Sequence, residues 1–222
     1  MDEASSRGPG GFFGFNGNTI RAGIALALMR RLGVDAFVET GSSGGATAFL
    51  VAAETRLPVR SCDTAPEAVR IASRNLRPFG RRVRVVEADA RDFLRDVAAD
   101  VSLRRPFFYL DAHSLDDIPL VRELSIILAH WPEFIVLVDD FQVPGDAGFR
   151  YYAWGEEVQG LEAVAETLGA SPAPLGVFFP AYPSILETGL RSGWALIVPE
   201  AMAEAVEGLV PRTLLLRASL RS

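Results

Sequence analysis

Residues 36–47, with the sequence AFVETGSSGGAT, are the stretch that decides the fold. The apolar run Ala36–Glu39 predicts a short buried strand, and Ala46–Arg56 predicts a helix after the turn. The glycines between them let the backbone turn tightly and let a ligand approach the main chain. A strand, a glycine-rich turn and a helix in this order indicate the first unit of an α/β protein.

The same alternation continues toward the C-terminus. Further strands are predicted at Val59–Asp63, Arg82–Glu87, Pro106–Asp111 and Phe134–Asp139. Helices are predicted at Thr19–Leu32, Pro66–Leu76, Ala90–Val97, Leu120–His130 and Glu157–Leu168. Apolar strands separated by helices indicate a parallel sheet covered on both faces. Because Gly176–Phe179 and Gly193–Val198 are neighbouring apolar runs, we predict a Rossmann-like, doubly wound α/β fold: a mostly parallel sheet with an antiparallel C-terminal edge pair.

The length and composition favour one domain. A chain of 222 residues fits a single large domain, and the hydrophobic share of 49% is ordinary for a globular enzyme. Residues 1–17 are rich in glycine and phenylalanine and predict an N-terminal arm, which precedes a single domain over residues 18–222. Phe12, Phe13 and Phe15 of this arm are expected to cover the site or to pack on a neighbouring subunit, so homo-oligomerisation stays open.

Charge and cysteine content exclude several classes of function. The formal net charge of −6 argues against nucleic acid as a partner. Cys62 is the single cysteine, so an intrachain disulfide and a cysteine-based zinc site are excluded. The N-terminus lacks the pattern of a signal peptide, and the apolar run Ile24–Met29 is too short to cross a membrane. The expectation is a soluble, bacterial, cytoplasmic protein without a membrane partner.

An acidic residue ends or follows each of the five predicted strands. These residues are Glu39, Asp63, Asp89, Asp111 and the pair Asp139-Asp140. Ligands of open α/β sheets bind beyond the carboxyl ends of the strands, and carboxylates buried there need a partner that offsets their desolvation. We therefore expect the functional site at this edge of the sheet.

The glycine turn does not have the spacing of a dinucleotide-binding loop. With Gly41 as the first glycine, that fingerprint would require glycine at Ser43 and Ala46. The order acidic-x-Gly-x-x-x-Gly instead resembles motif I of class I S-adenosylmethionine-dependent methyltransferases. The resemblance implies that the turn wraps the methionine part of S-adenosylmethionine through Glu39, Thr40, Gly41, Ser42, Ser43 and Gly44. The alternative is a purely structural turn.

Two acids further along the chain suit the nucleoside. Asp63 ends the second strand about 20 residues beyond the turn, where a carboxylate accepts hydrogen bonds from ribose hydroxyls. Asp89 and Ala90 resemble the adenine-contacting position of the same methyltransferases. Helix capping is the alternative role for both acids. NAD enzymes also place an acid at the position of Asp63, so a dehydrogenase is a weaker alternative.

Three acids follow two strands that are predicted to be adjacent. Asp111, Asp139 and Asp140 would then lie side by side, and such carboxylates repel one another unless a cation neutralises them or one keeps its proton. Carboxylate oxygens without a cysteine suit Mg²⁺ better than zinc. Asp111 is also expected to face the cofactor. The alternative is that Asp140 caps a turn and Asp111 alone faces the pocket.

These acids carry a more specific resemblance. Asp139 and Asp140 follow Asp111 by 28 and 29 residues. This spacing is similar to that of the metal-dependent sugar O-methyltransferases of the macrocin and mycinamicin type, and of the cephalosporin hydroxylase family. The resemblance covers roughly residues 35–155 and implies that Asp111, Asp139 and Asp140 hold a magnesium ion. The chain departs from these families by having Asp-Asp rather than Glu-Asp, and by the segment Val143–Phe149.

His113 is one of two histidines and lies two residues beyond Asp111. A histidine at this place is a candidate general base for the acceptor hydroxyl, with Asp111 beside it in the catalytic set. The resembling families have their base-like histidine one residue further along, where this chain has Ser114, and a surface histidine is the alternative. His130 is expected to be structural.

The predicted function is S-adenosylmethionine-dependent O-methylation of a small hydroxylated molecule, assisted by a divalent metal. Alternatives are a metal-independent methyltransferase and a non-catalytic nucleoside-binding protein of the same fold. Aromatic residues that follow the acidic pair are expected to pack on the core or to form a substrate wall; they are Phe141, Phe149, Tyr151, Tyr152 and Trp154.

Overall fold

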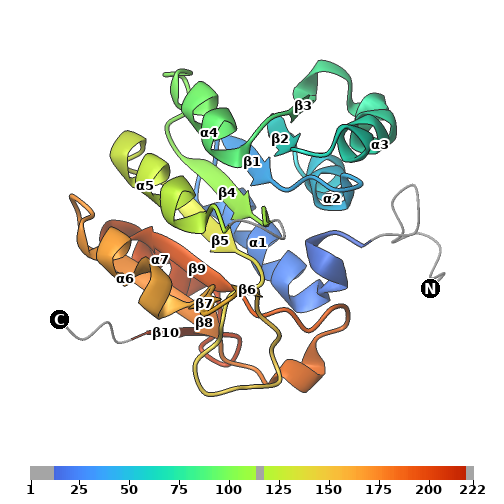
Figure 1. Cartoon of the computed structure of the whole chain (residues 1–222). Helices are drawn as coiled ribbons and strands as arrows, with labels where there is room; N and C mark the ends of the chain where they lie inside the picture. The colour runs from blue at the N-terminus through green and yellow to red at the C-terminus, as the bar shows by residue number, and fades with distance from the viewer. Residues whose placement is uncertain (1–12, 114–117, 219–222) are drawn as a thin grey trace.

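One eight-stranded sheet forms the centre of the molecule (Figure 1). The computed structural model describes residues 13–113 and 118–218. Five strands are parallel: β1 (Ala36–Thr40), β2 (Val59–Asp63), β3 (Val83–Glu87), β4 (Pro106–Leu110) and β5 (Ile135–Val138). The antiparallel part consists of β8 (Leu175–Pro180), β9 (Ala195–Pro199) and β10 (Leu215–Arg217). The order β10-β8-β9-β5-β4-β1-β2-β3 confirms the predicted α/β sheet with its antiparallel C-terminal pair.

Helices cover the sheet on both faces (Figure 1). Seven α-helices are described: α1 (Thr19–Arg31), α2 (Ala46–Glu54), α3 (Pro66–Leu76), α4 (Ala90–Ala98), α5 (Leu120–His130), α6 (Leu161–Gly169) and α7 (Glu200–Leu209). The contacts α4–α5 and α5–α6 make one row, whereas α1–α7 and α2–α3 are paired. Short 3₁₀ helices are η2 (Phe15–Gly17), η3 (Arg77–Arg82) and η4 (Ser184–Leu186).

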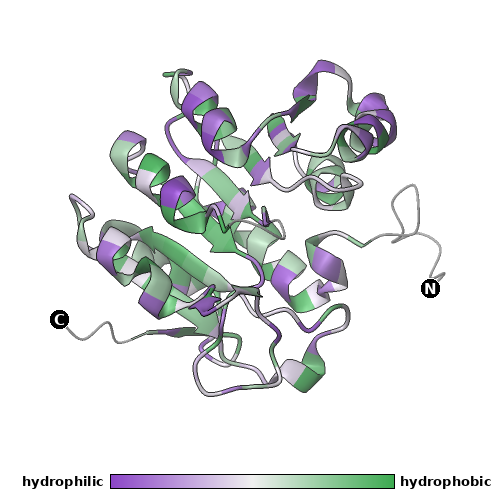
Figure 2. Ribbon diagram, in the orientation of Figure 1, coloured by the Kyte–Doolittle hydropathy of each residue, from purple (hydrophilic) through white to green (hydrophobic). Residues whose placement is uncertain are grey.

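The hydrophobic pattern explains these layers. Every residue of β1, β4, β5 and β9 is buried, as expected for strands covered on both faces. In α4, Phe93, Leu94 and Val97 are buried at helical spacing, while Arg95 faces solvent. Figure 2 shows the hydrophobic colour on the sheet and hydrophilic bands on the helices around it. None of the described helices has both the length and the apolar character needed to cross a membrane.

The region after β5 differs from the prediction. The helix expected from Glu157 begins at Leu161, because the preceding Gly160 is extended, with φ −156°. Glu157–Val158 forms β7 instead and pairs with β6 (Ala153–Trp154) in a small hairpin. The sheet also has an edge strand, β10, for which the sequence analysis had no prediction.

The strand register sets the place of the site. Thr40 lies opposite both Cys62 and Leu110, and Leu110 lies opposite Val138. The parallel strands therefore end at nearly the same level, and the residues that follow each strand meet at one edge of the sheet.

Candidate functional site

A cavity of about 430 Å³ lies at the carboxyl ends of the parallel strands. Its lining includes eight residues from the predicted site: Gly41, Ser43, Asp63, Asp89, Ala90, Asp111, His113 and Asp140. Asn16 and Leu190 complete the wall from opposite ends of the chain. The cavity therefore joins the glycine turn to the acids after β4 and β5.

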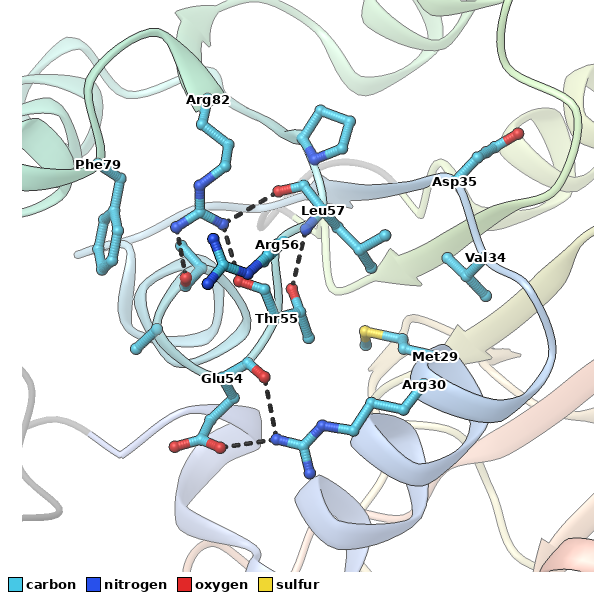
Figure 3. A pocket seen from close by; sticks show the side chains of 13 residues that line it. Met29, Arg30, Val34, Asp35, Glu54, Thr55, Arg56, Leu57, Phe79 and Arg82 are labelled. Atoms are coloured by element: carbon cyan, nitrogen blue, oxygen red, sulfur yellow. Dashed lines mark hydrogen bonds and ion pairs between the residues drawn. The ribbon is translucent and has the colours of Figure 1, made fainter.

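A larger hollow of about 970 Å³ lies at the amino ends of the strands (Figure 3). Arg82 donates there to the carbonyls of Ala52, Thr55 and Leu57, at the end of α2. Arg30 pairs with Glu54 at 2.7 Å. These two arginines stabilise the end of a helix, where the carbonyls carry partial negative charge. This hollow is therefore less suited to chemistry than the cavity at the carboxyl ends.

Gly41 shapes the turn after β1. Its φ is +83°, and a Cβ atom there would lie 2.4 Å from the main-chain oxygen of Asp111. The amides of Gly41 and Ser42 donate to the carbonyl of Cys62, which ties the turn to the end of β2. Glycine is thus required both by the left-handed backbone and by the close approach of the next loop.

Asp63 holds the other side of this turn. Its Oδ2 accepts from the amide of Ser43 at 2.8 Å, and its Oδ1 accepts from the amide of Ala65 at 2.9 Å. An ionised carboxylate has about four acceptor sites, so two stay available to ribose hydroxyls. The structure thus shows a local structural role, and the ribose role stays a prediction.

Asp89 caps α4. Its side chain accepts from the amide of Arg91 at 2.9 Å and pairs with the guanidinium of the same residue at 2.6 Å. The hydrogen bond from the Arg91 side chain is the main cause that lowers the pKa of Asp89. Because Asp89 and Ala90 both line the cavity, capping and the predicted adenine contact are compatible.

The remaining turn residues do not line the cavity. Glu39 is buried and accepts a hydrogen bond from Ser61 at 2.6 Å, and its burial raises its pKa to about 8. Thr40 and Ser42 have buried hydroxyls with no hydrogen-bond partner among the described residues. Gly44 accepts from Asn75 through its carbonyl. Direct contact of Glu39, Thr40, Ser42 and Gly44 with a cofactor stays a prediction.

Asp111, His113 and Asp140 form a compact group on the acceptor side. One ligand atom from each lies within 4.8 Å of the others. His113 Nε2 is 3.1 Å from Asp140 Oδ2. Asp140 has a left-handed backbone with φ 48°, which is uncommon outside glycine and is frequent at functional sites. In the described part of the chain, this is the group that could hold a metal ion.

The structure places Asp139 outside this group, which departs from the predicted metal set. Asp139 is fully buried and pairs with Arg21, also fully buried. Its carboxylate also accepts from the side chains of Asn16, Tyr109 and Ser192, and from the amide of Asp140. Burial acts to raise its pKa, but Arg21 and these donors lower it below the ordinary value. Both carboxylate oxygens are thus occupied by internal donors.

Asp111 has the opposite electrostatic environment. Burial, and then the negative charges of Asp139 and Asp140, raise its pKa well above the ordinary value, although Arg21 acts in the other direction. The Tyr109 hydroxyl donates to the side chain of Asp111 in a long hydrogen bond of 3.3 Å. A carboxyl in this situation favours either a proton or a cation beside it.

The sequence did not predict Arg21 or the hydrogen bonds of the N-terminal turn, although it placed Phe15 in an arm expected to cover the site. Asn16 and Leu190 are joined by a hydrogen bond from the amide of Leu190, and Asn18 donates to the carbonyl of Leu190. Phe15 is buried against Tyr109, with ring centroids 5.1 Å apart. No local motif marks these contacts. Phe12 and Ser114 lie outside the described residues.

A signal for Arg21 was nevertheless present. Arg21, Ala25 and Leu28 share one face of α1, and all three are buried. An arginine in an apolar stripe at this spacing predicts a buried ionic partner.

Comparison of sequences identifies no relatives: no protein-family model and no curated protein matches the chain. Solved structures do match. An O-methyltransferase from Bacillus cereus, solved with S-adenosylhomocysteine, is 18% identical, with TM-score 0.62 over 82% of this chain and 81% of that chain. A putative caffeoyl-CoA O-methyltransferase from Staphylococcus aureus is 16% identical, with TM-score 0.58 over 82% of this chain and 84% of that chain.

A third similar structure comes from Streptomyces achromogenes. TomG from Streptomyces achromogenes, an O-methyltransferase of tomaymycin synthesis solved with S-adenosylmethionine, is 18% identical, with TM-score 0.58 over 81% of this chain and 79% of that chain. At these identities the likeness establishes the fold. The chain therefore has the Rossmann-like α/β fold of these methyltransferases, as its alternation of strands and helices predicted.

Proposed function

We propose that this chain, with its class I methyltransferase fold, transfers a methyl group from S-adenosylmethionine to a hydroxyl of a small molecule. The observation that carries the proposal is that one cavity, at the carboxyl ends of the strands, has two chemically different halves. Gly41, Ser43 and Asp63 offer a turn and a carboxylate for a nucleoside. Asp111, His113 and Asp140 offer charged groups for an acceptor.

The reaction needs few groups. The carbon–sulfur bond of the sulfonium breaks as the methyl carbon bonds to the acceptor oxygen, and S-adenosylhomocysteine leaves as a neutral thioether. The hydroxyl loses its proton. The chain's task is to hold that oxygen in line with the methyl group and to accommodate the proton, so much of the rate gain is positioning.

The donor set fits a divalent cation, with Asp111, His113 and Asp140 as its ligands. Two carboxylates and an imidazole lie within reach of one ion, and the pKa of Asp111 is raised by burial and then by the negative charges of Asp139 and Asp140, which a cation would offset. The two carboxylates suit Mg²⁺ and Mn²⁺ alike, so Mn²⁺ can stand in for the predicted Mg²⁺ in binding experiments. When bound, such an ion lowers the pKa of an acceptor hydroxyl as a Lewis acid.

A metal-independent methyltransferase is the second candidate. The distance of 3.1 Å between His113 Nε2 and Asp140 Oδ2 favours it, because a carboxylate that orients an imidazole is the usual arrangement of a general base. In this candidate His113 takes the hydroxyl proton. Turnover measured with Mg²⁺, with Mn²⁺ and with EDTA separates the two: activity lost in EDTA and restored by metal supports the first, and unchanged activity supports the second.

Cofactor binding is tested by calorimetry with S-adenosylmethionine, S-adenosylhomocysteine and NAD. We expect both sulfur nucleosides to bind and NAD not to bind. Asp63→Ala should weaken the binding of S-adenosylhomocysteine by about 10–100-fold, the order expected when hydrogen bonds to a charged carboxylate are lost. Glu67→Ala is the matched control, since Glu67 is an exposed acid in α3. Binding of NAD alone would refute the proposal.

Methyl transfer is tested with S-adenosylmethionine labelled in its methyl group and a panel of phenols, sugars and hydroxy acids. We expect a labelled methyl group bonded to an acceptor oxygen and stoichiometric S-adenosylhomocysteine. Binding of the cofactor without transfer to any member of the panel would favour the non-catalytic alternative.

A further inference from the structure

The segment between β5 and α6 returns to the acidic pair. The amide of Tyr152 donates to the carbonyl of Asp140 at 2.8 Å. Gln159 donates through its amide to the carbonyl of Tyr152 at 2.9 Å and through its side chain to the carbonyl of Asp139 at 2.6 Å. The side chain of Gln159 is buried next to the acidic pair. The main chain at Tyr152 is therefore held through its amide by Asp140 and through its carbonyl by Gln159.

The ring of Tyr152 lies flat against His113. Their centroids are 4.3 Å apart, and the two planes differ by 13°. His113 comes from the loop after β4, and its Nε2 contacts Asp140. Its side chain is about one third exposed (34%), and the Tyr152 ring covers one face of the imidazole.

We propose that Tyr152 is a positioning residue: its ring holds the His113 imidazole in the orientation that directs Nε2 toward Asp140. The stacked ring orients His113 whether the histidine holds a metal ion or takes a proton. Only the effect of this orientation on activity rests on the proposed function. Groups that orient a metal-binding histidine commonly change metal affinity by 10–100-fold when they are removed.

The neighbouring tyrosine provides a matched control. Tyr151 is 43% exposed, and its ring makes no recorded stacking contact within the described residues. Tyr152→Phe retains a ring of the same shape, whereas Tyr152→Ala removes it. The series Tyr152→Ala, Tyr152→Phe and Tyr151→Ala therefore separates loss of the stack from loss of a hydroxyl and from a general change in this segment.

The histidine content of the chain provides the readout. Only His113 and His130 are present, so the imidazole carbon-bound protons give two sets of signals in proton NMR spectra. His130 lies at the end of α5 and contacts the carbonyl of Ile126, away from the cavity lining. A His130→Gln variant assigns the signals. Ring stacking shifts the His113 signals upfield, and bound paramagnetic Mn²⁺ broadens them.

In the wild type, we expect upfield His113 signals that Mn²⁺ broadens selectively, with His130 as the internal reference. Tyr152→Ala should move the His113 signals downfield and raise the Mn²⁺ concentration for half-broadening by about 10-fold or more. Tyr152→Phe and Tyr151→Ala should keep both properties. Circular dichroism and the His130 signals confirm that each variant is folded.

Two results would overturn the proposal. Unchanged His113 signals in Tyr152→Ala mean that the ring does not orient the histidine. If Tyr151→Ala weakens Mn²⁺ binding and shifts the His113 signals as much as Tyr152→Ala does, the effect belongs to the segment and not to the stack. If Mn²⁺ leaves wild-type His113 sharp, metal assistance fails, and the positioning role is then decided by whether Tyr152→Ala loses the nuclear Overhauser contacts between the His113 ring and the Asp140 methylene protons.

Discussion

The two halves of the cavity are built in different ways. On the cofactor side, the acids bind near their own loops: Asp63 accepts from the amide of Ala65, and Asp89 from that of Arg91. On the acceptor side, Asp139 is bound by Asn16, 123 positions earlier, and by Ser192, 53 positions later. Asp63 and Asp89 are bound from within 20 positions, with Ser43 as the most distant donor to Asp63, whereas Asp139 is bound from much more distant parts of the chain.

Within the acceptor side, two adjacent aspartates have different roles. Asp139 and Asp140 are adjacent and chemically identical, but one is fully buried against Arg21 and the other faces the cavity beside His113. Asp139 joins the N-terminal turn to the sheet, while Asp140 stays available for chemistry. Substitutions that affect one aspartate and spare the other test this division.

The largest effect is expected for Asp139→Asn. The change leaves the guanidinium of Arg21 buried without its main counter-charge, which costs about 3–5 kcal/mol of the free energy of unfolding. Glu187, 3.8 Å from Arg21, is the remaining acid and compensates in part. Urea unfolding followed by circular dichroism measures the loss.

Asp140→Asn is the matched control. Its partly exposed side chain contacts His113, and asparagine accepts a left-handed backbone well, so we expect a loss below about 1 kcal/mol. Mn²⁺ binding should show the reverse order, with Asp140→Asn losing more affinity than Asp139→Asn. Equal losses of stability in the two variants would contradict the division of tasks.

The fold was predictable because its signals are local. The apolar run of β1, the turn at Gly41 and the helix α2 follow one another within residues 36–54, and each subsequent βα unit repeats that pattern. The limits of this approach appear after β5. There, the hairpin β6–β7 and the later start of α6 depend on Gly160 and on contacts with the acidic pair.

The site was predictable in part for the same reason. Strand ends place Asp63, Asp111 and Asp140 at one edge of the sheet, and sequence spacing is enough to expect them there. Which of two adjacent aspartates turns inward depends on Arg21 and Asn16, whose distance from them in sequence carries no information about contact. The structure was needed to assign Asp139.

The second largest effect is expected on the cofactor side, where Glu39 makes the stability of the fold depend on pH. Burial raises the pKa of Glu39 from 4.5 to about 8, so between these values the folded state keeps a proton that the unfolded state has released. The stability contributed by neutral Glu39 is complete below about pH 4.5 and is lost as the pH rises through about 8. At about 1.4 kcal/mol per pKa unit, the loss between about pH 5 and pH 8 is about 4 kcal/mol.

Glu39→Gln should remove this dependence, because the amide does not titrate and still accepts from Ser61. Urea unfolding of the cofactor-free protein between about pH 5 and pH 9 measures the difference from wild type. Glu67→Gln should leave the slope of the wild type unchanged, since the Arg70 side chain lowers the pKa of Glu67 below this window. A Glu39→Gln slope equal to that of the wild type would exclude a buried, protonated Glu39.

The third effect lies where the two halves meet. Gly41→Ala places a Cβ atom 2.4 Å from the Asp111 main-chain oxygen on a left-handed backbone, and we expect a loss of about 2–3 kcal/mol. Gly44→Ala is the control, because its nearest neighbour is Ile71 at 3.9 Å, and its effect should be within about 1 kcal/mol of the wild type. Thermal unfolding compares the two, and equal midpoints would contradict the close packing of Gly41 on the acceptor loop.

The smallest effect is expected for Asn16→Gly. Asn16 has φ 56° and donates to Asp139 at 2.9 Å, and glycine adopts this backbone without strain, so the change isolates the hydrogen bond. Asp139 keeps Arg21 and its other donors, which limits the loss to about 1 kcal/mol. Asn16→Ala adds a left-handed alanine at a further cost of about 1–2 kcal/mol. Hydrogen exchange at the Leu190 amide, which donates to the Asn16 carbonyl, reports whether the turn stays attached. A small loss with Leu190 still protected means that the Arg21–Asp139 pair anchors the acceptor side and that the N-terminal turn depends on it. A loss as large as that of Asp139→Asn would instead make the turn itself the anchor.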